Sequence, residues 1–371
     1  MSAIPSHNVD QSFELLGSYV DIVSADQLKS LLLKKYAVSG KDFILCDNNT
    51  KKVCYPIVKK LIPDLDDTRC IVIDHGEDGK NISTAHQIWN FLQENGADRN
   101  SRLISLGGGI VTDIGGFAAS TYKRGISFIH IPSTLIGMVD ASIGGKNAVN
   151  LGHVKNQVGT FSLPEGVLIH PGFLHTLHWD ELLSGFAEIV KIALAFDKQF
   201  WQRIIQVQII EAERDNLLKS LSDRWLKKVS LLKASVVEQD FKEENKRQCL
   251  NFGHTIGHAL EALYLSKGLQ LSHGLAVAAG IICETEIATH QGSLKLADAD
   301  RIRYFIAENF PKVRFAEEEI ETIIAFVRHD KKNYQGKIKM PILEAPGKCV
   351  HGITCREELF RLSLSAYNKL S

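Results

Sequence analysis

Hydrophobic positions in the first part of the chain fall into short runs separated by helix-like stretches. Runs typical of buried strands lie at residues 43–46, 70–73, 102–106 and 128–131. A helix-like stretch covers residues 85–95, between the second and third runs. Alternation of strands and helices predicts a mostly parallel, doubly wound α/β sheet.

From about residue 171 onward the spacing of apolar residues becomes helical. Residues at i, i+3 and i+4 are apolar over 181–195, 217–239, 254–265 and 273–289, which predicts amphipathic helices. A segment with Pro and Gly at 342–352 predicts a late turn or hairpin. A chain of 371 residues is long enough for two domains. We predict an α/β domain over 1–170 and an all-α domain over 171–371.

Charge and composition narrow the class of protein. Lys+Arg and Asp+Glu both number 43, so no overall field favours nucleic acid. No apolar run approaches the roughly 20 residues that span a bilayer, and the first 17 residues resemble neither a signal nor a transit peptide. The seven cysteines lack CxxC spacing, so we expect no disulfides, no thiolate zinc site and a cytoplasmic location.

A glycine-rich segment follows the third apolar run. Residues 105–113 read SLGGGIVTD, and Gly107, Gly108 and Gly109 let the backbone approach a phosphate. The start of the next helix adds partial positive charge. The pattern is GGGxxxD rather than GxGxxG, so a plain strand-to-helix turn is an equal alternative. Asp47 and Asp74, which end the first two runs, suit ribose hydroxyls, with helix capping as the alternative.

Histidines in the second half suggest a metal site. In NFGHTIGH, His254 and His258 lie at i, i+4 and therefore on one helical face. His273 follows in SHGLAVA, and Glu188 precedes them in SGFAEIVK. Two imidazoles and a carboxylate are the ligands of a catalytic zinc with an open position. Spacing alone suggests His258 as a third ligand. Core or surface histidines are the alternative, and the HExxH glutamate of a metalloprotease is missing.

Several cations interrupt glycine-rich or apolar stretches instead of lying among other charges. Together they suit a substrate with a phosphate and a carboxylate, although solvated surface lysines are the common alternative. They are Lys146, Lys155 (beside Asn156), Lys191, Lys233, Arg247, Lys331 and Lys332.

These motifs together resemble the 3-dehydroquinate synthase family of sugar-phosphate cyclases. Eight segments carry the resemblance in family order: GGGIVTD, YKRG, IPST, VDASIGGKNAVN, VKN, SGFAEIVK, NFGHTIGH and SHGLAVA. The resemblance implies an N-terminal NAD-binding α/β domain, a C-terminal helical metal-binding domain and an active site in the cleft between them. It implies a homodimer that acts on a small sugar phosphate.

The resemblance also implies residue roles. The metal, zinc or alternatively cobalt, would be bound by Glu188, His254 and His273. NAD would be surrounded by Asp47, Asn49, Glu77, Lys80, Gly108, Gly109, Asp113, Ser133, Thr134, Asp140, Lys146 and Thr176. Substrate would meet Lys146, Lys155, Asn156, Lys191, Lys233, Arg247, Asn251, His258, one of Lys331 and Lys332, and Arg124 of the neighbouring subunit. The family makes His258 a substrate or proton-transfer residue and not a ligand.

The implied activity is conversion of 3-deoxy-D-arabino-heptulosonate 7-phosphate (DAHP) into 3-dehydroquinate and phosphate. The family reaction combines transient oxidation by NAD, β-elimination of phosphate, re-reduction and an intramolecular aldol closure. A paralogous cyclase making 2-deoxy-scyllo-inosose or an epi-valiolone is the nearest alternative, but Lys233, Arg247 and Asn251 suit a carboxylated substrate. A metal-dependent polyol dehydrogenase would release NADH and needs no such lysine set. The intact metal and lysine positions argue against a non-catalytic NAD-binding regulator.

The chain departs from the family pattern at three positions. Asn147 stands where the family usually has Thr, Val154 where Gly is common, and Leu275 where Glu is frequent. None is an expected metal ligand or charged substrate contact, so we expect the reaction to be retained.

Overall fold

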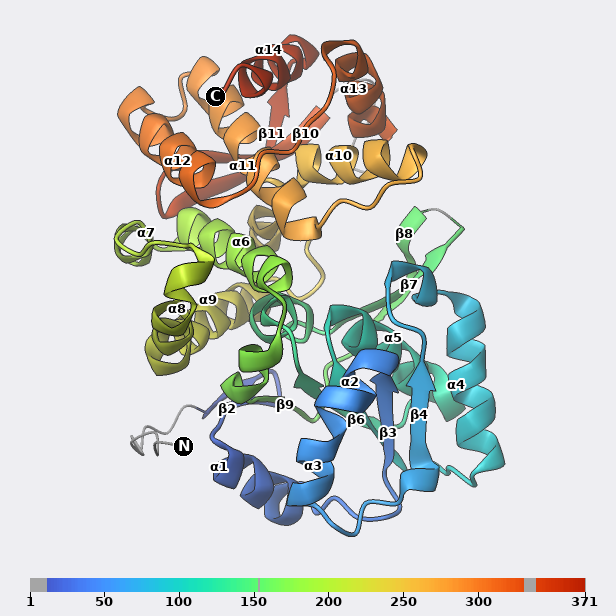
Figure 1. The fold of residues 1–371 in the computed structure, drawn as a ribbon. Helices are drawn as coiled ribbons and strands as arrows, with labels where there is room; N and C mark the ends of the chain where they lie inside the picture. Colours follow the sequence, from blue (N-terminus) through green and yellow to red (C-terminus); the bar gives the residue numbers. More distant parts are fainter. Residues whose placement is uncertain (1–11, 153, 330–337, 371) are drawn as a thin grey trace. The chain divides into compact units, whose positions relative to one another are not determined.

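The structure is a computed structural model that describes residues 12–152, 154–329 and 338–370 (Figure 1). Contacts divide the chain into two compact units. The first contains the chain up to Ser133 together with Ala141–Thr176, and the second contains Thr134–Asp140 together with the chain from Leu177 onward. The short segment Thr134–Asp140 thus joins the second unit, although the sequence pattern put it in the first.

The first unit is built on a seven-stranded sheet. Its strands are ordered β1-β2-β9-β6-β5-β3-β4, all parallel except for the antiparallel pair β1 and β2. A separate antiparallel ribbon consists of β7 and β8. The elements are β1 (Ser12–Leu15), β2 (Ser18–Ile22), α1 (Ala25–Ser30), β3 (Phe43–Asp47), α2 (Asn48–Val53), α3 (Tyr55–Leu61), β4 (Cys70–Ile73), α4 (Ile82–Glu94), β5 (Arg102–Gly107), α5 (Gly109–Thr121), β6 (Ser127–Pro132), β7 (Lys146–Leu151), β8 (Val154–Phe161) and β9 (Gly166–Ile169).

The predicted runs become β3, β4, β5 and β6, so the doubly wound parallel sheet is confirmed. Each is a short apolar segment, and pairing buries both faces of β3, β5 and β6 and one face of the edge strand β4. The helix α4 begins at the cap Asn81, whose side chain accepts from the Thr84 N–H. Its buried positions include Ala85, Ile88 and Leu92, spaced to form one apolar face in the core of this unit.

The crossovers that follow the neighbouring strands β3 and β5 run in opposite directions across the sheet. After β3 the chain moves outward to β4, and after β5 it moves the other way to β6. Right-handed crossovers in opposite directions place helices on opposite faces. Figure 1 shows α2 and α3 in front of the sheet and α5 behind it. Such a reversal is a topological switch point, and ligands of open parallel sheets bind outside the carboxyl ends of its strands.

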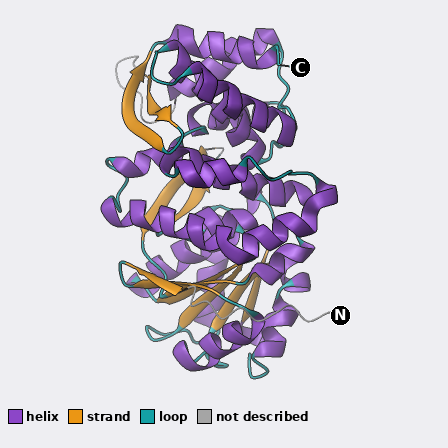
Figure 2. Cartoon of the chain, turned by 90° about the vertical axis from the view of Figure 1, so that its left-hand side faces the viewer, coloured by secondary structure: helices purple, strands orange, loops and turns teal. Residues whose placement is uncertain are grey.

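The second unit is mainly helical, as Figure 2 shows by colour. The prediction of an all-α unit was incomplete, because a two-stranded antiparallel ribbon forms where the sequence predicted a late hairpin. The predicted helix at 217–239 is divided by a π-helical turn at Leu221–Trp225. The elements are α6 (Trp179–Phe196), α7 (Lys198–Ile204), α8 (Arg214–Ser220), α9 (Leu226–Gln239), α10 (His254–Ser266), α11 (His273–His290), α12 (Leu296–Asn309), α13 (Ile320–His329), β10 (Ile338–Ala345), β11 (Lys348–Cys355) and α14 (Glu357–Asn368).

Helix α6 runs through the core of this unit, and every side chain from Leu182 to Ala195 is buried. Two glycines bring neighbouring backbones close to it. A Cβ at Gly185 would lie 2.5 Å from the Leu135 Cβ, and one at Gly274 would lie 2.3 Å from the Ser184 Cα. These contacts fix the start of α11, and the segment that includes Leu135, against α6. Among the described helices, none combines the length and apolar character that crossing a membrane requires.

Candidate active site

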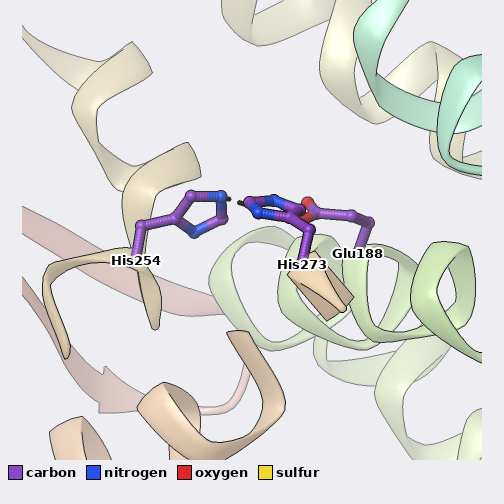
Figure 3. A group of neighbouring side chains, drawn as sticks. All are labelled: Glu188, His254 and His273. Atoms are coloured by element: carbon purple, nitrogen blue, oxygen red, sulfur yellow. Dashed lines mark ion pairs between the residues drawn. The ribbon is translucent and has the colours of Figure 1, made fainter. Parts of the chain in front are cut away.

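Three side chains from three helices point toward one another in the second unit (Figure 3). Glu188 comes from the middle of α6, while His254 and His273 are the first residues of α10 and α11. The Glu188 Oε1 lies 3.6 Å from the His254 Nε2 and 3.3 Å from the His273 Nε2. Glu188 is fully buried and His254 is 8% exposed, so the cluster is largely shielded from water.

The charge of Glu188 is balanced by Lys191, one turn later on α6. Their side chains form an ion pair and are 0% and 1% exposed, respectively. Burial alone would raise the pKa of Glu188, but the Lys191 ammonium and His273 outweigh it and lower that pKa to about 2. Burial likewise works against the Lys191 charge, and Glu188 and Asp140 outweigh it, so the pKa of Lys191 is raised. Both groups are therefore charged at neutral pH.

The two imidazoles differ in their electrostatic surroundings. Burial, followed by the charge of Lys191, holds the pKa of His254 well below its usual value. His254 is consequently neutral and offers a lone pair. Burial also disfavours a charged His273, but Glu188 and Glu261 outweigh it and raise the pKa of His273 to about 10. Without a metal ion, His273 therefore acts as the counter-cation of two carboxylates.

The three residues fit a divalent metal ion. Ligands about 2.0–2.1 Å from a tetrahedral ion lie about 3.3–3.4 Å apart, close to the observed separations of 3.3 and 3.6 Å. Neither buried oxygen of Glu188 accepts a well-oriented hydrogen bond from the described residues. A buried carboxylate without such a donor, facing two imidazoles, is the ligand set of a zinc site that keeps an open position.

Buried cations surround the same part of the unit. Lys233 is 5% exposed and its Nζ lies 2.5 Å from the Asp140 Oδ1, while it also donates to the Asp140 carbonyl. Burial raises the pKa of Asp140, but Lys233 and Lys191 outweigh it and lower that pKa. Burial lowers the pKa of Lys233 and that of Arg247. This part of the unit therefore holds three buried cations, and the carboxylates that interact with them are Glu188, Asp140 and Asp240.

The positions of Arg247 and Asn251 depend on the turn that precedes α10. Asp240 accepts backbone N–H groups on both oxygens, including that of Arg247 at 2.9 Å. The Arg247 Nη1 donates to the Phe241 carbonyl at 2.6 Å, and the Asn251 amide donates to Glu243. Asp240 and Glu243 were not singled out in the sequence, where acids within a charged segment carry no distinguishing signal.

His258 lies one turn after His254, with ring centroids 5.2 Å apart. It is exposed, and its candidate ligand atoms lie within 4.8 Å of those of Glu261 and His273, which makes a second possible metal-binding group. Sequence reasoning missed Glu261. It could have been found from its position in the sequence, because a residue three positions after His258 lies on the same face of α10.

The glycine-rich segment of the first unit lies at the switch point. Gly107 ends β5, Gly108 precedes the helix and Gly109 begins α5. A Cβ at Gly107 would lie 2.5 Å from Val111, so the turn requires glycine there. Asp47 ends the adjacent β3, where its Oδ1 accepts the N–H groups of Asn49 and Thr50 and caps α2. Helix capping is thus its observed local role, and a ribose contact stays a prediction.

A polar network joins the ribbon β7–β8 to the rest of the first unit. The Lys80 side chain, 4% exposed, donates to the Asp113 Oδ2 at 2.5 Å and to the Asn156 Oδ1 at 2.6 Å. The Asn150 amide donates to Glu77 at 2.8 Å and its oxygen accepts the Asn156 N–H. Expected NAD residues and an expected substrate residue are therefore held together by direct contacts.

The other predicted residues are mostly exposed, while Ser133 contacts the glycine-rich segment. Lys146 is exposed on β7 and Lys155 is exposed on β8, while Thr176 is exposed at the end of the first unit. The Ser133 N–H donates to the Gly107 carbonyl, and Thr134 caps the next turn in the second unit. Lys331 and Lys332 lie outside the described residues. Arg124 is exposed and lines a surface pocket with Asp98, Arg99, Asn100 and Lys123.

The departure at Asn147 has a structural role. Asn147 is 3% exposed, and its amide donates to the carbonyls of Gly145 and Ser162, which lie side by side at one end of the ribbon. A Cβ at Gly116 would lie 1.9 Å from the Asn147 Oδ1, so the side chain packs directly on α5.

Comparisons with known proteins agree with this arrangement. Sequence models of the 3-dehydroquinate synthase N-terminal and C-terminal domains match residues 70–184 and 185–333. A 3-dehydroquinate synthase from Parabacteroides distasonis is 38% identical over 329 residues, covering 89% of this chain and 92% of that protein.

Two solved structures are similar in fold. One is 2-deoxy-scyllo-inosose synthase complexed with carbaglucose-6-phosphate, NAD⁺ and Co²⁺, with a TM-score of 0.80 at 21% identity, covering 95% of this chain and 98% of that chain. The other is 2-epi-5-epi-valiolone synthase from Streptomyces hygroscopicus with NAD⁺ and Zn²⁺ bound, with a TM-score of 0.80 at 24% identity, covering 99% and 98%. Matches to both domain families in consecutive order, and to a relative over nearly its full length, show that the chain belongs to the 3-dehydroquinate synthase family.

Proposed function

We propose that the chain is a 3-dehydroquinate synthase, a carbon–oxygen lyase acting on phosphates. It converts DAHP into 3-dehydroquinate and phosphate with bound NAD and a divalent metal ion, zinc in the first place and cobalt as an alternative. The family membership and the relative at 38% identity support the reaction. The two structures of similar fold, with NAD⁺ and Zn²⁺ or Co²⁺, support the cofactors.

The observation that carries the proposal is the set of buried cations beside the ligand cluster. Lys191 pairs with the ligand Glu188, and Lys233 pairs with Asp140, which also interacts with Lys191 and Arg247. Burying cations is costly unless an anion compensates them. A substrate with a carboxylate and a phosphate would meet cations that are shielded from water, where charge-assisted hydrogen bonds are strong.

Each group of residues has a defined task in this reaction. When bound, NAD supplies a reversible hydride acceptor and the metal ion supplies a Lewis acid for substrate hydroxyls. The hydride removed from C5 is returned within the same turnover, so no second redox substrate is consumed. Glu188, His254 and His273 hold the metal ion. The glycine-rich segment and the Lys80 network bind NAD.

The remaining residues bind substrate and move protons. Lys233 and Asn251 bind the carboxylate side of the substrate, and His258 relays protons at a ring nitrogen. Phosphate is held by Lys155, Arg247, one of Lys331 and Lys332, and Arg124 of a second subunit. Arg124 suits contact with another chain, because it is exposed in a basic pocket and its backbone is held at φ 70° beside Lys123 at φ 50°.

The alternative is another sugar-phosphate cyclase, and the two structures of similar fold are consistent with it without favouring it. Lys233, Arg247 and Asn251 favour the carboxylated substrate instead. The test incubates the protein with DAHP, catalytic NAD⁺ and Zn²⁺ and follows phosphate release together with NADH absorbance. We expect phosphate release without lasting NADH, abolished by a chelator and by His254→Ala.

Other outcomes would overturn the proposal. If DAHP is inert while sedoheptulose 7-phosphate or glucose 6-phosphate releases phosphate, the protein is a paralogous cyclase. Stoichiometric NADH with a simple polyol would make it a dehydrogenase.

A further inference from the structure

Both imidazoles of the ligand cluster occupy the first position of a helix. His254 begins α10 and His273 begins α11. Helix ends leave backbone groups without intrahelical partners and are the parts of a helix that fray. A metal site nevertheless needs each ligand atom held in one orientation. Other groups must therefore hold these two helix starts.

Glu261 of α10 reaches across to the imidazole of α11. It is 8% exposed, and its Oε2 lies 3.5 Å from the His273 Nδ1. The opposite ring nitrogen of His273, Nε2, faces Glu188 at 3.3 Å. A ring that binds a metal ion through Nε2 carries its proton on Nδ1, where a carboxylate accepts it and fixes the ring orientation.

Glu284 of α11 reaches in the opposite direction, to the start of α10. It is fully buried, and its Oε2 accepts the Gly253 N–H at 2.7 Å while its Oε1 accepts the Ile256 N–H at 3.2 Å. Gly253, the residue before His254, has no side chain with which to cap the helix. The cap that α10 lacks in its own sequence is thus supplied by another helix.

Close packing of the two helices makes both contacts possible. A Cβ at Gly280 of α11 would lie 1.9 Å from the Gly253 carbonyl oxygen, and one at Gly257 of α10 would lie 3.1 Å from the Ala276 carbonyl oxygen. The backbones therefore touch without intervening side chains. A glutamate on either helix is long enough to reach the first turn of the other.

We propose that Glu261 and Glu284 are positioning residues of the metal centre. Each lies on one of the two helices that carry the imidazole ligands, and each acts on the ligand of the other helix. Glu261 of α10 orients the His273 ring of α11, and Glu284 of α11 holds the first turn of α10 and hence His254. The inference rests on the proposed function only in taking Glu188, His254 and His273 as the metal ligands.

The alternative for Glu261 is direct metal binding, because His258, Glu261 and His273 also form a group that fits an ion. That group shares His273 with the first and includes the exposed His258, whereas Glu188 and His254 are buried. Co²⁺ absorption separates the two roles, since loss of a ligand changes the coordination spectrum and loss of an orienting carboxylate weakens binding with the same coordination.

The test measures binding of Zn²⁺ and Co²⁺ to the full-length protein by chelator competition, without substrate. The variants are Glu261→Gln, Glu284→Gln and, as a matched control on α11, Glu286→Gln, which removes a carboxylate paired with Arg303 and His290. We expect metal affinity to fall about 10- to 100-fold in the first two variants and to be unchanged in the control. The Co²⁺ spectrum of Glu261→Gln should keep the wild-type coordination.

The melting temperature of the metal-free protein measures the stability cost of each change. Both variants should lower it, because Glu261 pairs with His273 and Glu284 caps a helix, so metal affinity is compared well below both melting temperatures, where each variant is folded. If Glu284→Gln does not fold, Glu284→Asp, which keeps the carboxyl oxygens but holds them one methylene farther away, takes its place. Wild-type metal affinity in Glu261→Gln, or in a folded Glu284 variant, overturns the corresponding half of the proposal, as does a changed Co²⁺ coordination in Glu261→Gln.

Failure of the proposed function would look different. A wild-type protein that binds the metal ion but does not convert DAHP disproves the synthase activity and leaves the effect of both glutamates on metal affinity standing.

Discussion

Lys191 and Glu188 form an ion pair on one face of α6, and the two side chains are 1% and 0% exposed. Both side chains are buried, where an unpaired charge is very costly. The ion pair therefore holds the ligand cluster together before any metal ion binds. If Lys191 alone is removed, the charge of the buried Glu188 carboxylate is balanced, among the described residues, by the partly exposed His273.

Lys191→Met should therefore destabilise the metal-free protein by about 3–5 kcal/mol, the usual cost of leaving one member of a buried pair uncompensated. Urea unfolding measures this. The control Lys228→Met breaks the pair with Asp197, in which the Lys228 side chain is 46% exposed, and should cost about 0–1 kcal/mol. The double variant Glu188→Gln/Lys191→Met should recover much of the loss. A Lys191→Met protein as stable as the wild type would refute this view of the pair.

His130 should make the protein sensitive to acid. It is 2% exposed on β6, and burial lowers its pKa to about 3. Because the folded pKa lies below the unfolded value of about 6.5, the unfolded state binds more protons in this window. Stability is thus lost as pH falls from about 6.5 toward 3, at up to about 1.4 kcal/mol per pH unit from this group.

The measurement compares urea unfolding of wild type and His130→Phe at pH 7, 6, 5 and 4. Phenylalanine fills a similar volume beside Phe128 and does not titrate. The stability of the variant relative to the wild type should rise steadily as pH falls below 6.5. If the stability of the wild type and of His130→Phe changes with pH in the same way, His130 does not contribute to acid sensitivity.

Lys80 should contribute to NAD binding. Its ammonium joins Asp113 of α5 to Asn156 of β8, and hydrogen bonds with a charged partner are worth about 1.5–3 kcal/mol. Lys80→Met should weaken NAD⁺ binding about 10- to 100-fold, measured by calorimetric titration. Lys59→Met, which removes a half-buried lysine paired with Asp67 in the same unit, should leave NAD⁺ affinity unchanged. Equal affinities in both variants would contradict the role of this network.

Gly280→Ala should affect stability in two opposite ways, through helix propensity and through packing. Alanine favours a helix over glycine by about 1 kcal/mol, but its Cβ would lie 1.9 Å from the Gly253 carbonyl oxygen. Backbone atoms cannot move away cheaply, so overpacking should win and lower the melting temperature. The shift of α10 should weaken metal binding too, because Gly253 precedes His254. A higher melting temperature would mean that the helices separate without cost.

The sheet was predictable where its strands are short, continuous apolar runs. Residues 43–46, 70–73, 102–106 and 128–131 are apolar runs, and they become the parallel strands β3, β4, β5 and β6. The ribbon β7–β8 was not predicted, because much of β8 is exposed and no apolar face marks its register. Strand β9 is a run of four residues whose position depends on pairing with β2 and β6.

The ligand cluster was predictable only as a set of candidates. The spacing of His254 and His258 placed both on one helical face, and this left open which of them faces Glu188. Helix packing brings the His254 Nε2 within 3.6 Å of Glu188, while His258 is exposed beside Glu261 and His273. A period of 3.6 residues identifies a face, and only the neighbouring helices decide what that face meets.

By itself, the sequence determined the four apolar strands β3 to β6, several of the long helices and the residue types that can bind a metal ion and a phosphate. Local patterns carry this information, since burial and helix periodicity depend on neighbours along the chain. Tertiary structure alone decided that Glu261 and Glu284 reach the helix starts of His273 and His254. A glutamate in a helix looks the same in sequence whether it is solvated or buried, and its partners come from residues 12 to 31 positions away.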